Sequence, residues 1–181
     1  MHSPVPLDPG PVVLRMLRHL NREQMDRLRE LSDRELGSGY ISFERKRTVV
    51  AIFKNAPVGF VSFSLELPPD IRTLPGIAPL PENTGYIAHL AVDSAHQRRG
   101  IGTRLIKSAI DFLQNHRPSI AMVGWESLSG VQVEKLALKF GFARLATYKH
   151  FWTEDSLVKQ YSCPSCGLPC LCSAALYLRS A

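Results

Sequence analysis

A glycine-containing turn between an apolar strand and an amphipathic helix constrains this chain more than any other stretch. The strand is expected over residues 86–93 and the helix from residue 101 to 115, with Gln97-Arg98-Arg99-Gly100-Ile101-Gly102 between them. The first N–H groups of a helix lack intrahelical acceptors and the helix dipole is positive there, so an anion gains hydrogen bonds at this end. The sequence therefore predicts a phosphate-binding turn. A glycine turn that merely starts an ordinary helix is the alternative.

The segments after this turn continue a recognisable order of elements. Residues 119–127 predict a strand, and residues 131–142 predict an amphipathic helix that closes with Gly141-Phe142. Together with the strand end Leu90-Ala91-Val92-Asp93, this order resembles the GNAT superfamily of acyl-CoA-dependent N-acetyltransferases. The signature of that family is Gln or Arg, two residues, Gly, one residue, and Gly or Ala, which residues 97–102 match. The resemblance covers roughly residues 48–151.

The resemblance implies a fold and a cosubstrate. The fold would be α/β of the α+β type: a mixed, mostly antiparallel central sheet with helices on both faces. The cosubstrate would be acetyl-CoA, with the strand backbone meeting the pantetheine and thioester and the turn meeting the pyrophosphate. The residues that would bind it are Leu90, Ala91, Val92, Gln97, Arg98, Arg99, Gly100, Ile101, Gly102 and Thr103.

The proton-transfer groups of the family are not all present. Many relatives have a tyrosine where this chain has Ala137, and an asparagine near the start of that helix where Ser129 or Gly130 stands here. A thiolate with a pKa near that of a free thiol leaves without a strong acid, so this departure does not exclude acetyl transfer. The candidate catalytic residues are Tyr86, His89 and Glu126. A purely structural role for each of the three is the alternative.

Four cysteines form a second group with chemical potential. Cys163, Cys166, Cys170 and Cys172 lie within ten residues, and C-P-x-C-G is half of a zinc-knuckle pattern. A structural zinc site is therefore one prediction. A redox pair and a metal-free reduced loop remain open, because C-x-C on a strand would point its two sulfurs apart.

The remaining segments predict strands at residues 12–17, 48–53, 58–67, 142–151 and 174–178, and a helix capped by Asn21. Residues 1–11 predict a flexible proline-rich leader, and residues 12–181 a single domain with a cysteine-rich insertion at about 161–173. Residues 68–84 carry five prolines and predict a long loop without secondary structure, which would wall the acceptor groove, meet a second subunit in a homodimer, or be a tolerated insertion. Without a signal peptide or a membrane-spanning apolar run, a cytoplasmic location is expected.

These features predict an enzyme that moves an acetyl group from acetyl-CoA to a primary amine. Two other interpretations stay open. One is a non-catalytic acyl-CoA-binding module. The other is an enzyme similar to the toxins that acetylate aminoacyl-tRNA, because the segment LAVDSAHQRRGIG of this chain resembles the corresponding segment of those toxins. The net charge of +6 attracts anions, so an acceptor that is macromolecular or anionic is favoured over a polycationic drug. A nucleic-acid partner is compatible with the same charge.

Overall fold

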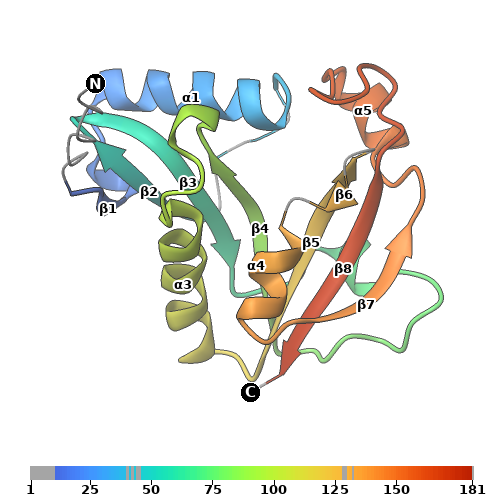
Figure 1. Cartoon of the computed structure of the whole chain (residues 1–181). Coiled ribbons are helices and arrows are strands. Elements are labelled where there is room, and N and C mark those ends of the chain that lie inside the picture. The colour runs from blue at the N-terminus through green and yellow to red at the C-terminus, as the bar shows by residue number, and fades with distance from the viewer. Residues whose placement is uncertain are drawn as a thin grey trace, which may run out of the picture.

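The computed structural model describes residues 11–39, 41, 43, 46–127, 130–131 and 133–180. Seven strands form one sheet in the order β1-β2-β3-β4-β5-β8-β7, and the short strand β6 pairs only with β5 (Figure 1). The strands are β1 Val13–Met16, β2 Arg47–Phe53, β3 Ala56–Ser64, β4 Thr84–Val92, β5 Ser119–Ser127, β6 Gly130–Val131, β7 Ala143–Tyr148 and β8 Ser173–Ser180. The mixed, mostly antiparallel sheet is as predicted.

Among the described strands, β4 and β5 are the parallel pair, and they separate before either ends. Their pairing runs from Thr84 opposite Ser119 to Ile87 opposite Met122 and stops there. Beyond this point β4 stays paired with β3 as far as Val92, while β5 stays paired with β8. The sheet is therefore split by a V-shaped gap between the carboxyl halves of β4 and β5 (Figure 1).

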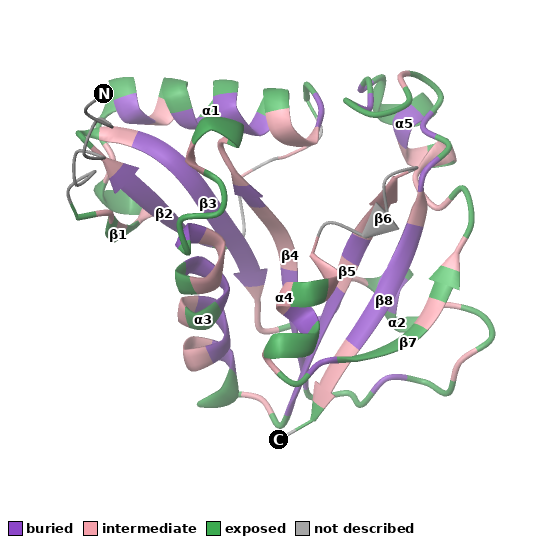
Figure 2. Ribbon diagram, viewed as in Figure 1, coloured by how far each residue is buried: buried purple, intermediate pink, exposed green. Residues whose placement is uncertain are grey.

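Helices cover both faces of the sheet, as expected. The α-helices are α1 Arg22–Leu36, α2 Pro69–Arg72, α3 Ile101–Gln114, α4 Glu134–Lys139 and α5 Thr153–Lys159, and two short 3-10 helices span Leu17–His19 and Ser94–His96. Alternate residues of β2 face opposite sides: Val49 and Ala51 pack in the cluster with α3, and Val50 and Ile52 pack in the cluster with α1. The buried parts of the strands and helices accordingly face one another (Figure 2). None of the described helices is long and apolar enough to cross a membrane.

Local sequence signals account for several element boundaries. The side chain of Asn21 accepts a hydrogen bond from the N–H of Gln24 at 2.9 Å, and the Gln24 side chain accepts from the N–H of Asn21 at 3.3 Å, which makes the predicted capping box. The β2–β3 hairpin turns at Lys54 and Asn55, which both have positive φ angles. A two-residue turn of this kind matches the twist of the paired strands.

The segment 68–84 is not the structureless loop that its prolines suggested. It contains α2, and the buried side chains of Ile71 and Leu80 pack with Tyr86 against the side of the sheet opposite α3. The hydroxyl of Tyr148 donates to the carbonyl of Pro75 at 3.0 Å. Apolar residues between the prolines thus give the segment a core of its own, which periodicity over so short a stretch did not reveal.

Other boundaries also differ from the predictions. The last predicted helix, 131–142, is reduced to α4, and the strand predicted over 142–151 is β7, which ends at Tyr148. The helix α5 was not predicted. Its seven residues are too few for a helical period to stand out. The helix also depends on the turn that follows it and carries the four cysteines, residues 163–172, which we call the cysteine turn.

Candidate active site

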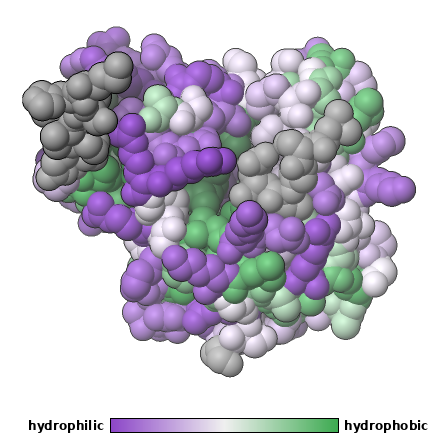
Figure 3. All heavy atoms as spheres, viewed as in Figure 1, coloured by the Kyte–Doolittle hydropathy of each residue, from purple (hydrophilic) through white to green (hydrophobic). Residues whose placement is uncertain are grey.

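A groove of about 1010 Å³ follows the carboxyl half of β4 and the glycine turn. We call it the cofactor groove. Nine of the ten residues predicted to bind acetyl-CoA line it, Arg99 being the exception. The opposite wall comes from α4 and from the cysteine turn, through Leu136 and Pro164. Figure 3 shows a hollow with a hydrophobic floor over β4, rimmed by hydrophilic residues.

The glycine turn has the backbone geometry expected of an anion-binding helix start. Gly100 is the N-cap of α3 with a left-handed φ of 76°, and Arg98 also has a positive φ of 59°. A Cβ on Gly100 would meet nothing within 4 Å, so the left-handed backbone, rather than crowding, favours glycine there. Turns that alternate in this way direct successive N–H groups toward one side, where an anion can bind.

Side chains from three segments fix the turn against the sheet. The side-chain amide of Gln97 donates to the carbonyl of Val92 at 3.0 Å, so this motif residue closes the turn onto the end of β4. Asp93 accepts from the N–H of Ala95 at 2.9 Å and from Arg34 of α1 at 2.6 Å. Helix α1 therefore supports the glycine turn through the contact between Arg34 and Asp93. The arginine-rich sequence of this helix did not indicate that long-range contact.

Asp93 should give the domain an acid-sensitive increment of stability. Burial alone would raise its pKa, but the bonds from Ala95 and His96 and the charge of Arg34 lower the pKa below its ordinary value. Because the folded pKa is depressed, this increment is present above the unfolded pKa of about 3.9 and is lost as the pH falls through the folded pKa. Asparagine keeps an acceptor for the N–H of Ala95 but loses the charge paired with Arg34, so we expect Asp93→Asn to lower the free energy of unfolding by at most ~1 kcal/mol at pH 7 and by less near pH 3, as measured by urea unfolding.

Asp111→Asn is the matched control for this measurement. Asp111 pairs with Lys107 on the exposed surface of α3, and its side chain is 49% exposed. Surface pairs of this kind contribute little to stability. Equal losses for both variants at both pH values would contradict the role assigned to Asp93.

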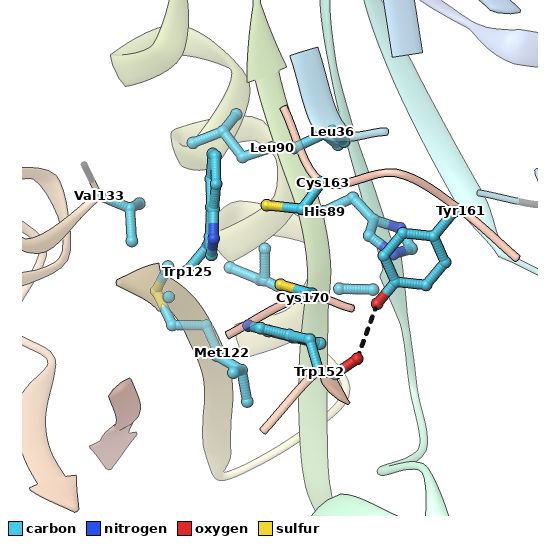
Figure 4. Close-up of a pocket in the computed structure, with 14 residues that line it drawn as sticks. Leu36, His89, Leu90, Met122, Trp125, Val133, Trp152, Tyr161, Cys163 and Cys170 are labelled. Atoms are coloured by element: carbon cyan, nitrogen blue, oxygen red, sulfur yellow. Dashed lines mark hydrogen bonds between the residues drawn. The ribbon is translucent and has the colours of Figure 1, made fainter. Parts of the chain in front are cut away.

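A second, smaller hollow lies deeper in the gap between β4 and β5, and we call it the apolar cavity (Figure 4). Its volume is about 120 Å³. Met122 and Trp125 reach it from β5, and Trp152 and Tyr161 from the two sides of α5. The cavity and the cofactor groove share four lining residues, namely Leu36, Leu90, Trp125 and Val133. The two hollows therefore adjoin where the strands separate.

His89, one of the three candidate catalytic residues, lines the apolar cavity. Burial, and then the positive charges of Lys46 and Lys159, lower its pKa to about 3. The imidazole is consequently uncharged at neutral pH. A neutral imidazole can exchange hydrogen bonds with a bound amine, but its low pKa makes it a weak base.

The other two candidate catalytic residues do not line either hollow. Tyr86 is buried with Ile71 and Leu80 on the opposite side of the sheet, and burial, followed by the charge of Asp70, raises its pKa above the ordinary value. Glu126 forms a 3.0 Å ion pair with Arg144. Neither residue lines the cofactor groove or the apolar cavity, and a proton-transfer role stays a prediction for both.

The four cysteines come together in space. Their Sγ atoms all lie within 4.8 Å of one another, with distances of 3.8 Å for Cys163–Cys172, 3.8 Å for Cys166–Cys170 and 3.5 Å for Cys166–Cys172. A tetrahedron with Zn–S bonds of about 2.3 Å has edges of about 3.8 Å, so these spacings fit one zinc ion. Cys170 and Cys172 precede β8 and are not on a strand, which removes the geometric objection to C-x-C.

The surroundings of the cysteine cluster also fit a metal site. Cys163 and Gly167 exchange two backbone hydrogen bonds of 3.0 and 2.9 Å, which close the first turn. The N–H of Leu171 donates to the sulfur of Cys166 at 3.2 Å, and the indole of Trp125 donates to the sulfur of Cys172. Donors of this kind stabilise thiolates bound to a metal.

Helix α5 and the end of α1 hold the cysteine turn in place. Ser156 of α5 is fully buried, and its hydroxyl accepts from the N–H of Cys170 at 2.9 Å. A Cβ on Gly37, just after α1, would lie 2.9 Å from the carbonyl oxygen of Ser162, so the two segments touch closely. The predicted insertion at about 161–173 is thus packed against the active-site gap.

Sequence reasoning missed the aromatic residues of the apolar cavity. Trp125 sits on a strand that was predicted, but nothing in the pattern showed that β5 diverges from β4 there. Trp152 and Tyr161 flank the unpredicted helix α5. The two tryptophans of the chain were the one sequence signal that could have pointed to this cavity, because both of them line it.

A split sheet with a glycine turn at the gap is the architecture of an acyl-CoA-dependent acetyltransferase. Residues 14–142 match the family model described as the acetyltransferase (GNAT) family, and the chain belongs to this family of enzymes, for which acetyl-CoA is the typical cosubstrate. Among curated proteins, none matches the chain significantly.

Solved structures show the same fold at low identity. A structure of the NatC complex bound to Gag peptide and CoA contains a chain that is 21% identical, with a TM-score of 0.66 over 95% of this chain and 99% of that one. NAA60 from Arabidopsis thaliana in complex with acetyl-CoA is 13% identical, with a TM-score of 0.66 over 94% and 98% of the two chains. An N-acetyltransferase from Staphylococcus aureus Mu50 is 13% identical, with a TM-score of 0.62 over 94% and 99%. These likenesses concern the fold.

Proposed function

We propose that the protein transfers the acetyl group of acetyl-CoA to a primary amine that enters through the apolar cavity. The observation that carries this proposal is the junction of the two hollows at Leu90 and Trp125, beside the half of β4 that no longer pairs with β5. A thioester bound along β4 would end at this junction. The amine would meet it there from the side of β5.

The protein's residues contribute mainly position and desolvation to this reaction. The amine nitrogen attacks the thioester carbonyl, the C–S bond breaks, the nitrogen loses one proton and the thiolate of CoA gains one. An apolar site disfavours the ammonium form, so the amine reacts as the free base. With His89 a weak base, we propose that both protons are exchanged with water through the cofactor groove.

The cysteine cluster would bind a structural zinc ion through Cys163, Cys166, Cys170 and Cys172. The sulfur spacing, the burial of three of the four cysteines and the N–H donors to sulfur support this role. Four thiolates leave no open coordination position for a substrate, so the ion would hold the fold of the turn. Because Cys163 and Cys170 also line the apolar cavity, the ion would set the shape of that cavity.

Consumption of acetyl-CoA tests the proposed function. We expect the purified protein to release free CoA faster with a primary amine than without one, and mass spectrometry should find the amine heavier by one acetyl group. Tight binding of acetyl-CoA without turnover of any amine would favour the non-catalytic binding module instead. An aminoacyl-tRNA acceptor and a homodimer stay predictions, since the described residues supply no observation that favours either.

A further inference from the structure

The apolar cavity has the size of one side chain. Trp125, Trp152, Tyr161 and Met122 surround a space of about 120 Å³ (Figure 4). An apolar protein cavity of about 150 Å³ can hold one benzene molecule. The apolar cavity is of similar size, so it has room for a single ring or a branched aliphatic group and not for a larger ring system.

The described wall of the apolar cavity contains no residue that carries a formal charge at neutral pH. None of the described residues that line it is Asp, Glu, Lys or Arg. A carboxylate or a second ammonium group entering it would lose hydration without gaining a charged partner in the cavity wall, since Lys46 and Lys159, whose charges act on His89, do not line it. If the cysteine cluster holds zinc, the thiolates of Cys163 and Cys170 also bring net negative charge to one edge, which further excludes anionic groups.

The position of the cavity limits the distance between the amine nitrogen of an acceptor and the apolar group that fills the cavity. The cavity meets the cofactor groove at Leu90 and Trp125, so a ligand filling the cavity can place an amine at the junction only through a short link. The basic residues Arg98 and Lys135 lie on the cofactor groove and not on the cavity. They suit the phosphates of CoA, so the positive net charge is not evidence for an anionic acceptor.

We infer that the acceptor is a primary amine with one uncharged apolar group, the size of a single ring or a branched aliphatic side chain, one or two carbons from the nitrogen. This inference rests on the proposed function and specifies its acceptor. It replaces the anionic acceptor suggested by composition. Two sources offer this chemistry: a free arylalkylamine or alkylamine, and the first residue of a peptide.

Tryptophan emission gives a measurement of cavity occupancy that does not depend on turnover. The chain has two tryptophans, and both line the cavity. Added 2-phenylethylamine or isoamylamine should change the emission in a saturable way, whereas ethanolamine, spermidine and glutamate should not. Peptides that differ only in a first residue of phenylalanine or aspartate distinguish the two sources: a response to the phenylalanine peptide supports a peptide acceptor, and its absence supports a free amine.

Replacing Trp152 tests the cavity in turnover. Trp152 lines the cavity but not the cofactor groove. We expect Trp152→Ala to raise the KM for the apolar amine about tenfold or more, since one hydrophobic contact discriminates by about 10–200-fold, and to leave the KM for acetyl-CoA unchanged. Trp152→Phe should restore most of the loss. The matched control is Phe112→Ala, which removes a partly buried ring stacked on His116, far from the cavity in the fold.

The outcomes separate this inference from the proposed function. Equal kcat/KM for 2-phenylethylamine and ethanolamine, or a larger value for spermidine, would overturn the inference while acetyl transfer itself stands. Saturable binding of 2-phenylethylamine without consumption of acetyl-CoA would reject the proposed function and support the cavity. If Trp152→Ala does not fold, Trp152→Phe and the emission titration of the unaltered protein still decide the matter.

Discussion

Gly100→Glu is expected to weaken acetyl-CoA binding about 100-fold, which corresponds to about 2.8 kcal/mol. The substitution puts a carboxylate at the N-cap of α3, beside the N–H groups that would receive the pyrophosphate. Two like charges about 4 Å apart repel by about 4 kcal/mol at the effective dielectric constant of a protein surface, which is enough for this loss. Isothermal titration calorimetry of both proteins with acetyl-CoA measures it.

Gly76→Glu is the matched control. Gly76 has a φ of 78°, close to the 76° of Gly100, and a Cβ at either position would meet nothing within 4 Å. Both substitutions therefore impose the same left-handed strain, but residue 76 is outside the cofactor groove. Equal acetyl-CoA affinity in the unaltered protein and in Gly100→Glu would show that the turn does not bind the pyrophosphate.

Cys170→Ser is expected to remove the metal and to destabilise the protein by several kcal/mol. Cys170 is 2% exposed, so the serine hydroxyl would be buried at a position shaped for a thiolate. With free zinc at about 1,000 times its dissociation constant, binding contributes about 4 kcal/mol of stability, which shifts the melting temperature by about 8–16 °C in a chain of this size. Metal analysis should find close to one zinc per unaltered chain and none per variant.

Ser162→Ala is the control for this experiment, since Ser162 is an exposed neighbour in the same turn and supplies no sulfur. A chelator should lower the melting temperature of the unaltered protein toward that of Cys170→Ser and leave the variant unchanged. A metal-free protein whose melting temperature is the same with and without added zinc would remove the site. Because the same turn borders the apolar cavity through Cys163 and Cys170 and the cofactor groove through Pro164 and Ser165, zinc loss should raise the KM of both the amine and acetyl-CoA.

Much of the fold could be predicted because its signals are local. The β2–β3 hairpin depends on a two-residue turn, and the start of α1 depends on Asn21 and Gln24. The glycine turn depends on two glycines at a fixed spacing. Each signal lies within a few residues of its effect. The segment 68–84 was misjudged for the opposite reason. Its buried residues Ile71 and Leu80 share a cluster with Ala121 of β5 and Leu176 of β8, which are distant in the sequence and lie outside any short window.

The sequence by itself determined the family, the glycine turn and the identity of the four cysteines, because glycine spacing and ligand type are properties of contiguous residues. Only the tertiary structure decided the separation of β4 from β5, the apolar cavity within it, and the gathering of four sulfurs within 4.8 Å. It also buried Tyr86 on the side of the sheet opposite α3, paired Glu126 with Arg144, and lowered the pKa of His89 by burial. Burial and charge at a site depend on which distant segments pack together, and that packing is a property of the whole folded chain.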